Sequence, residues 1–173
     1  MEILKCINSR RSVRNFSKKD VSETDMDDIL MAAVRAPNAG NIQEWRFIVV
    51  RKRETMEMLA EASFQQKVIA SAAVVIISCA DMDEIGKAYS SRGKDVYSLQ
   101  DAAVTCQNLM LAVWDKGIGS CWVGSFDEKK VQNILVLPKN VRPLAIIPLG
   151  YPQGHREKQP RKSLEEVVHH EFY

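Results

Sequence analysis

The segment AVVIISCA, at residues 73–80, is an unbroken run of apolar and small residues in a chain of 173. A run of this length predicts a strand that is buried within a sheet. Three further segments have the composition of strands: WRFIVVR at 45–51, SCWVGSF at 120–126, which is either a strand or an extended turn, and RPLAIIPLGYP at 142–152. The chain therefore contains core strands, and the segments between them decide the fold class.

Apolar residues recur at helical spacing between these strand candidates. Residues 2–11 are predicted to form a short helix. Residues 22–37 are predicted to form a second helix, because Ser22 or Thr24 can cap it and acidic residues fill its first turn. A third helical stretch is expected over 54–71.

The most strongly patterned helix is expected over residues 98–119, where Ser98 and Asp101 resemble a capping box. The polar segment at 81–95, just before it, is expected at the surface. Asp127 can cap a last short helix. Strands and helices in this arrangement indicate one α+β domain over the whole chain.

The overall charge is nearly balanced. Lys and Arg number 24, Asp and Glu number 22, and the net charge is +2, which argues against a dedicated nucleic-acid binder. The N-terminal residues do not resemble a secretory signal, and no apolar stretch approaches the roughly 20 residues of a membrane span. We therefore expect a cytoplasmic protein that binds neither membrane nor nucleic acid.

Four cysteines are present, and their spacing matches no zinc or iron–sulfur site, so we expect no metal. They lie at positions suited to buried, reduced thiols of a cytoplasmic protein: Cys6, Cys79, Cys106 and Cys121.

The stretch RRSVRNF places Arg10, Arg11 and Arg14 close together, with Ser12 between them. One interpretation is that these cations complement the dipole at a helix C-terminus. The other is a phosphate site, because guanidinium groups bind phosphate in a bidentate manner and a serine hydroxyl can reach a remaining oxygen. The sequence has no P-loop and no Rossmann glycine motif, so side chains would have to hold the phosphate.

Several blocks in the right order resemble the flavin-dependent nitroreductase family, and the resemblance extends from about residue 5 to 168. It implies an α+β fold with a central mixed or antiparallel sheet flanked by helices, in an intertwined homodimer. It also implies one FMN at each of two sites on the dimer interface, built by both chains. The blocks are RRSVRNF at 10–16, APNAGNIQEWRFIVV at 36–50, DAAVTCQNLMLAVWDKGIGSCWVGSF at 101–126, IIPLGYP at 146–152 and QPRKSLEE at 159–166.

The resemblance also assigns flavin contacts to residues near the N-terminus. In the RRSVRNF block, Arg10 and Ser12, with Arg11 beside them, would face phosphate or ribityl oxygens, and Arg14 would reach the ribityl chain or the pyrimidine edge. The PNAGN loop would come from the partner subunit and border the flavin, although alone it could be an ordinary turn. The loop residues concerned are Pro37, Asn38, Ala39, Asn41 and Gln43.

Further contacts are implied later in the chain. Gln66 and Lys67 would lie near the pyrimidine end of the flavin, although Lys67 could instead be a solvated helix residue. Arg161 would return to the phosphate, with Lys162 sharing that role or solvated. Near the ring and at the end of the last core strand, the implied contacts are Trp122, Val123, Gly124, Leu149 and Gly150; Trp122 could equally be core packing.

The implied activity is that of an FMN-dependent oxidoreductase, in which NAD(P)H reduces the flavin and a small acceptor reoxidises it in a ping-pong cycle. Hydride chemistry belongs to the flavin, so no catalytic side chain is expected. The short segment at 81–95 suggests an open site for nitroaromatic or quinone-like acceptors. The alternatives are a non-catalytic flavin carrier and a specialised member that performs dehalogenation or oxygen-dependent flavin chemistry.

Overall fold

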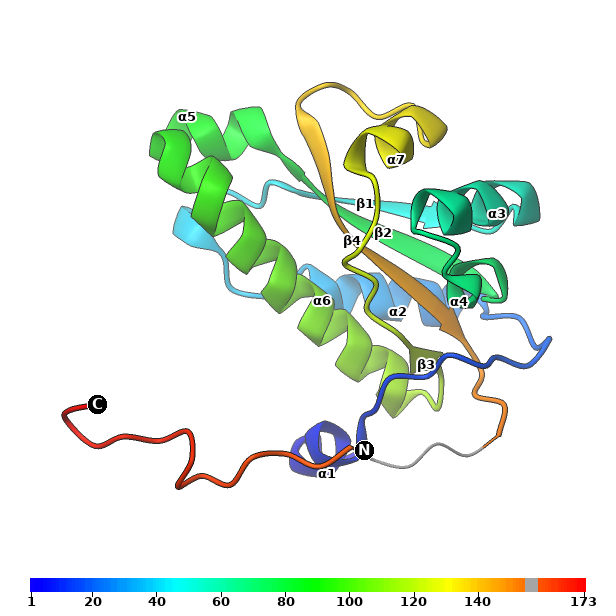
Figure 1. The fold of residues 1–173 in the computed structure, drawn as a ribbon, viewed down its shortest axis with the longest axis horizontal. Helices are drawn as coiled ribbons and strands as arrows, with labels where there is room; N and C mark the ends of the chain where they lie inside the picture. The colour runs from blue at the N-terminus through cyan, green and yellow to red at the C-terminus, as the bar shows by residue number, and fades with distance from the viewer. Residues whose placement is uncertain (155–158) are drawn as a thin grey trace.

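A four-stranded antiparallel sheet forms the centre of the molecule, in the order β1-β2-β4-β3 (Figure 1). The computed structural model describes residues 1–154 and 159–173. The strands are β1 (Trp45–Val50), β2 (Val74–Asp81), β3 (Gly119–Ser120) and β4 (Val141–Gly150). The buried strand expected at 73–80 is thus confirmed as β2, between β1 and β4, and the α+β class is confirmed with it.

Helices cover both faces of this sheet (Figure 1). One face carries α2 (Glu23–Ala33) and α6 (Ser98–Asp115), and the other carries α3 (Arg53–Ala62), α4 (Lys67–Ala70) and α7 (Glu128–Ile134). The remaining elements are α1 (Ile3–Ser9), the 3-10 turn η1 (Ala39–Asn41), α5 (Met82–Arg92) and the π-helical turn η2 (Gly93–Tyr97).

The side chains of β2 alternate between two apolar cores. Val75 and Ile77 belong to the core under α3, α4 and α7, whereas Val74 and Ile76 belong to the core under α2 and α6. Successive residues of a strand point to opposite faces of a sheet. Because both faces are covered, the strand needs apolar residues at every position, which explains the unbroken run in the sequence.

Two of the expected helix caps are confirmed. The Ser22 hydroxyl accepts a hydrogen bond from the Asp25 N–H at 3.1 Å, so Ser22 is the cap of α2. The Asp127 carboxylate accepts from the Lys130 N–H at 3.1 Å and begins α7. Each cap satisfies a backbone donor that has no partner within its helix.

The helix expected over 54–71 is interrupted. It is divided into α3 and α4, because Phe64 and Gln65 between them have φ angles of 55° and 62°. These angles lie in the left-handed region, which a right-handed helix cannot contain. The prediction of one continuous helix was therefore wrong.

The capping box expected at Ser98 and Asp101 was also wrong. The chain is already helical before Ser98, because α5 and η2 run into α6, and the Ser98 hydroxyl donates to the Lys94 carbonyl at 2.8 Å. The segment at 81–95 lies largely at the surface, as expected, and it is also largely helical, with Ile85 fully buried within it. The carboxylate of Asp101 is therefore available to bond outside its own helix.

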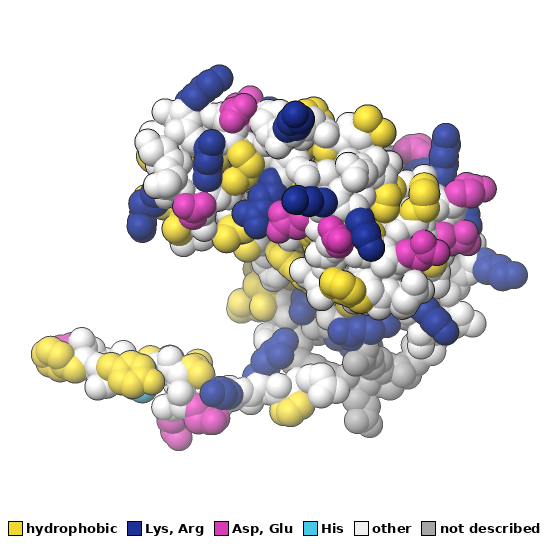
Figure 2. Space-filling model, turned by 45° about the horizontal axis from the view of Figure 1, so that its top comes forward, with side chains coloured by type: hydrophobic (Ala, Val, Ile, Leu, Met, Phe, Trp, Pro, Cys, Tyr) yellow, Lys and Arg dark blue, Asp and Glu magenta, His cyan; other side chains and the backbone are white. Residues whose placement is uncertain are grey.

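Several apolar side chains remain exposed in the single chain. They include Ile3, Leu4 and Ile7 on α1 and Met31 on α2. Residues 159–173 contain neither helix nor strand, and Figure 2 shows hydrophobic side chains along this tail. None of the described helices combines the length and the apolar character needed to cross a membrane.

Candidate functional site

Residues 10–17 form an extended segment that crosses the edge of the sheet where β3 pairs with β4. The Val13 N–H donates to the Ser120 carbonyl at 2.8 Å, and Ser12 forms a bridge to the same residue. Gly119 allows this approach, because a Cβ at that position would lie 2.6 Å from the Cβ of Val13. The sheet edge therefore fixes the backbone that carries the arginine cluster.

The arginines occupy different positions around this segment. Arg10 is the C-cap of α1, and its N–H donates to the Cys6 carbonyl at 3.0 Å, so the helix-end interpretation holds for this residue. The guanidinium of Arg11 lies over the ring of Trp114, 5.6 Å from its centroid. The Trp114 indole N–H donates to the Ser9 hydroxyl at 2.8 Å, which anchors the ring on which Arg11 stacks.

Two of these arginines line one small cavity. Its volume is about 100 Å³, and its lining includes Arg11, Arg14, Asn15, Trp114, Gln153 and Gly154. Within residues 1–154 and 159–173, none of the three clustered arginines forms an ion pair. Guanidinium groups without acidic partners, next to amide side chains, suit a bound anion such as a phosphate.

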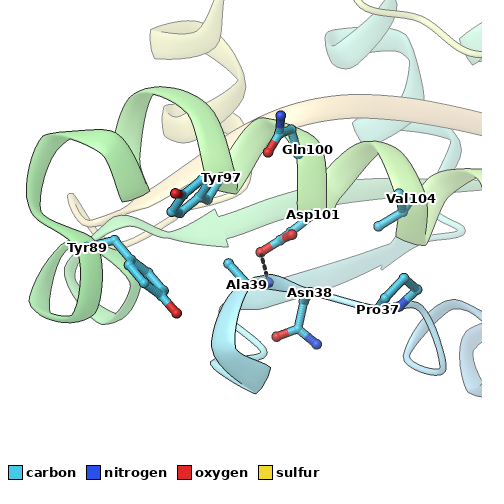
Figure 3. A pocket seen from close by; sticks show the side chains of 8 residues that line it. All are labelled: Pro37, Asn38, Ala39, Tyr89, Tyr97, Gln100, Asp101 and Val104. Atoms are coloured by element: carbon cyan, nitrogen blue, oxygen red, sulfur yellow. Dashed lines mark hydrogen bonds between the residues drawn. The ribbon is translucent and has the colours of Figure 1, made fainter. Parts of the chain in front are cut away.

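The PNAGN loop forms a second candidate region, at the start of α6. The Ala39 N–H donates to the Asp101 carboxylate at 3.0 Å, and the Gln43 N–H donates to the Asn38 side-chain oxygen at 3.0 Å. Figure 3 shows Asp101 reaching down from α6 to Ala39. Three residues of the loop have left-handed φ angles, at Gly40, Asn41 and Gln43.

A cavity of about 450 Å³ lies between this loop and the α5–α6 region (Figure 3). Tyr89 and Tyr97 stand on one side of it, with ring centroids 5.0 Å apart and rings nearly perpendicular. Tyr89 packs against Gly40 so closely that a Cβ there would overlap its hydroxyl. The other lining residues are Pro37, Asn38, Ala39, Gln100, Asp101 and Val104.

The two regions lie at opposite ends of α6. Asp101 in the first turn contacts the loop, and Trp114 in the last turn contacts Arg11. An α-helix rises about 1.5 Å per residue, so these contacts are about 20 Å apart along the axis. One chain therefore does not bring the arginine segment and the PNAGN loop together.

Other predicted residues do lie near the arginine segment. The stretch from Trp122 to Gly124 follows directly after Ser120, to which Val13 is bonded; Val123 is buried there, whereas Trp122 is 38% exposed. The exposure of Trp122 argues against the plain core-packing interpretation.

Gln66 contacts the segment that follows β3, and the end of β4 pairs with β3 itself. The Gln66 side chain donates to the Ser125 carbonyl at 3.0 Å, and Lys67 starts α4 next to it. Leu149 is fully buried and pairs with Ser120, while Gly150 pairs with Gly119. Arg161 and Lys162 are exposed on the tail, where they line none of the cavities described above, and their phosphate contacts stay a prediction.

Sequence reasoning missed a buried pair of acids below the PNAGN loop. Glu44 is 1% exposed, and its Oε2 atom has no hydrogen-bond partner within the described residues. Burial and the neighbouring Asp101 carboxyl raise the pKa of Glu44 to about 7. The available signal was an acid placed directly before the apolar strand β1. Tyr89 and Tyr97 were missed as well, because the segment at 81–95 was not expected to be helical.

Comparisons with known proteins place this geometry in a family. The model of the nitroreductase family matches residues 7–67 and 64–151. A protein of Archaeoglobus fulgidus, provisionally named NADH dehydrogenase/NAD(P)H nitroreductase, is 36% identical over 160 residues, which are 90% of this chain and 88% of that protein.

Two Bacillus proteins are also similar. The FMN reductase [NAD(P)H] of Bacillus subtilis is 26% identical, over 99% of this chain and 74% of its own. The structure of B. megaterium NfrA2 superimposes with a TM-score of 0.93 at 26% identity, over 100% of this chain and 75% of that one. The fold, the order of the motifs and these likenesses agree, and the chain belongs to the nitroreductase family.

Proposed function

We propose that this protein is an FMN-dependent oxidoreductase that takes electrons from NAD(P)H and passes them to a small acceptor. The observation that carries the proposal is the small cavity where Arg11 and Arg14 meet without acidic partners among the described residues. FMN ends in a phosphate monoester, which is the anion that such a group of guanidiniums suits. The relatives named as NAD(P)H-dependent nitroreductase and FMN reductase support the same cofactor and donor.

The residues around this cavity fit the chemical groups of FMN. Arg10, Arg11 and Ser12 would hold the phosphate, and Arg14 would hold the ribityl chain or the pyrimidine edge. Trp122, an exposed aromatic residue next to the segment, is suited to contact the flat ring. When bound, FMN supplies the hydride and electron chemistry. The chain's own residues bind the cofactor, orient it and leave one face of it accessible.

The second half of each site is proposed to come from a partner chain. The PNAGN loop lies about 20 Å from the Arg11 contact along α6, so the loop of the same chain does not reach a phosphate held there. In an intertwined homodimer, the partner's loop would occupy that place. The exposed apolar residues of α1 are suited to such an interface.

Three further features complete the proposal. Residues 1–173 form a single FMN-binding domain. The acceptor is a nitroaromatic or quinone-like compound that uses the same flavin face as the nicotinamide, in a ping-pong cycle. Cys6, Cys79 and Cys106 are buried free thiols, which suit a reducing compartment, and we place the protein in the cytoplasm.

The test is a spectrum of the purified protein. A yellow protein that NADH or NADPH bleaches without air, and that a nitroaromatic or quinone then recolours, is the expected result. A yellow protein inert to both nicotinamides would favour the flavin carrier. A colourless protein that FMN cannot reconstitute would overturn the proposal.

A further inference from the structure

Glu44 occupies an unusual position between the PNAGN loop and the sheet. Its carbonyl accepts from the Asp81 N–H at 2.8 Å, which fixes its backbone at the start of β1. Its side chain is buried with the Oε2 atom unpaired among the described residues. A buried carboxylate with an unpaired oxygen and no cation beside it is costly, so this carboxyl favours its neutral form.

The group that Glu44 meets is Asp101, which is 6% exposed. Asp101 is the neighbouring carboxyl that acts on Glu44, and a hydrogen bond between two carboxyls requires a proton on one of them. Asp101 also accepts from the Ala39 N–H at 3.0 Å. This divides the roles: Asp101 is the acceptor for two donors, and Glu44 carries the proton.

The surrounding charges favour the same assignment. Asp101 from α6 and Glu84 from α5 both raise the pKa of Glu44 by repulsion, and burial raises it most, to about 7. The nearby cation, Arg46 on β1, forms ion pairs with Glu84 at 2.8 Å and with Asp81 at 3.6 Å. No cation within the described part of the chain pairs with Glu44 itself.

We infer that Glu44 is a positioning residue, which in its neutral form donates to Asp101 and so holds the PNAGN loop in its flavin-binding shape through the Ala39 N–H. The loop needs such support, because Asn41 and Gln43 hold left-handed backbone angles. When Glu44 loses its proton, two adjacent carboxylates repel each other and the loop loosens. We call the contacts from Glu44 through Asp101 to the Ala39 N–H the clamp. Its effect on flavin binding rests on the proposed function, whereas the clamp itself does not.

Amide hydrogen exchange at Ala39 tests the clamp in the flavin-free protein. A raised pKa in the closed loop means that the clamp is fully formed below the ordinary value of 4.5 and weakens as the pH rises through about 7. We expect the protection factor of the Ala39 amide to fall about tenfold or more between pH 5 and pH 8. In Glu44→Gln, whose amide still donates but does not ionise, this loss should disappear.

Glu57→Gln, an exposed acid on α3, is the matched control and should keep the wild-type profile. An equal loss of protection in Glu44→Gln and wild type would overturn the inference. If Glu44→Gln does not fold, the pKa of Glu44 can be measured in the unchanged chain by a 13C titration of its carboxyl. A pKa at the ordinary value of 4.5 would also overturn the inference.

The FMN affinity separates the two proposals. We expect the FMN affinity of the wild type to decline with rising pH more steeply than that of Glu44→Gln, because only the wild type loses the clamp. The titration of the FMN phosphate is common to both proteins and cancels in the comparison. Equal declines would leave Glu44 without a positioning role toward flavin and would overturn that part. A protein that shows the amide profile but never binds FMN would overturn the proposed function and leave the clamp intact.

Discussion

The Arg11 side chain, which lines the small cavity, is held by a contact within its own chain. Arg11 stacks on Trp114, which is itself anchored by Ser9, so its position is fixed before any ligand arrives. A guanidinium that is already oriented loses less freedom on binding a phosphate than a free side chain does. The stacking on Trp114 thus orients the Arg11 side chain in advance for the proposed phosphate.

Replacing Arg10 or Arg11, the two arginines proposed to hold the phosphate, with Gln should therefore weaken FMN far more than riboflavin, which lacks the phosphate. A charge-assisted contact is worth about 1.5–3 kcal/mol, or roughly one to two decades in Kd. Fluorescence titration of both flavins measures the difference, with Lys129→Gln on the exposed side of α7 as the control. Equal losses for the two flavins would show that these arginines act on folding.

The cysteines give a second prediction at the residue scale. Burial raises the pKa of Cys79 to about 12 and that of Cys106 to about 11. Because only the thiolate is a good nucleophile, neither should react with iodoacetamide at pH 8 in the native protein. Mass spectrometry should find both alkylated in urea; alkylation at the unfolded rate in buffer would contradict their burial.

At the scale of elements, the contact between the arginine segment and the sheet edge depends on two glycines. Gly119 faces Val13, and a Cβ at Gly150 would lie 2.8 Å from the ring of Phe16. The side chain of Val13 and the ring of Phe16 leave no room for a methyl group, so any side chain at either glycine must displace the segment.

Gly119→Ala should consequently destabilise the fold by about 1–3 kcal/mol, the usual cost of overpacking, and weaken FMN as well. Gly86→Ala is the control, because its Cβ would meet only the flexible end of Lys94 and alanine favours a helix. Urea unfolding compares the two. A Gly119→Ala protein as stable as Gly86→Ala would mean that the segment does not pack as described.

The elements also show what a sequence reveals and what it does not. The unbroken run of β2 and the caps Ser22 and Asp127 were predictable, since local composition determines them. Asp101 was not, because its first-turn position fits a cap equally well, and only the fold shows that it bonds to Ala39, far away in the sequence. Similarly, nothing local marks the left-handed angle of Phe64 that divides α3 from α4.

The candidate site was predictable to a different degree. The order of the motifs pointed to the arginine segment and the PNAGN loop, and the flavin contacts of the residues in and near them stay a prediction. The resemblance did not indicate the buried Glu44, because a charged residue becomes informative only when its burial is known. Tertiary contacts, which single-sequence patterns do not contain, carry that information.

For the whole molecule, α6 separates the two halves of the proposed site within each chain. If a partner supplies the missing half, flavin retention must depend on dimerisation. Dilution below the dimer dissociation point should release FMN and lower the Tm together, by mass action. Sedimentation with absorbance detection at 450 nm, about the flavin maximum, follows both species; a monomer that keeps FMN bound would contradict the shared site.

If the partner supplies the PNAGN loop, the distance imposed by α6 also makes the two proposed sites of a dimer genetically separable. A chain with Arg11→Gln and a chain with a disabled PNAGN loop would each form dimers with two defective sites. In a mixed dimer, both defects fall in one site and the other site is wholly wild type. Two inactive proteins, unfolded and refolded together, should then restore activity through intersubunit complementation.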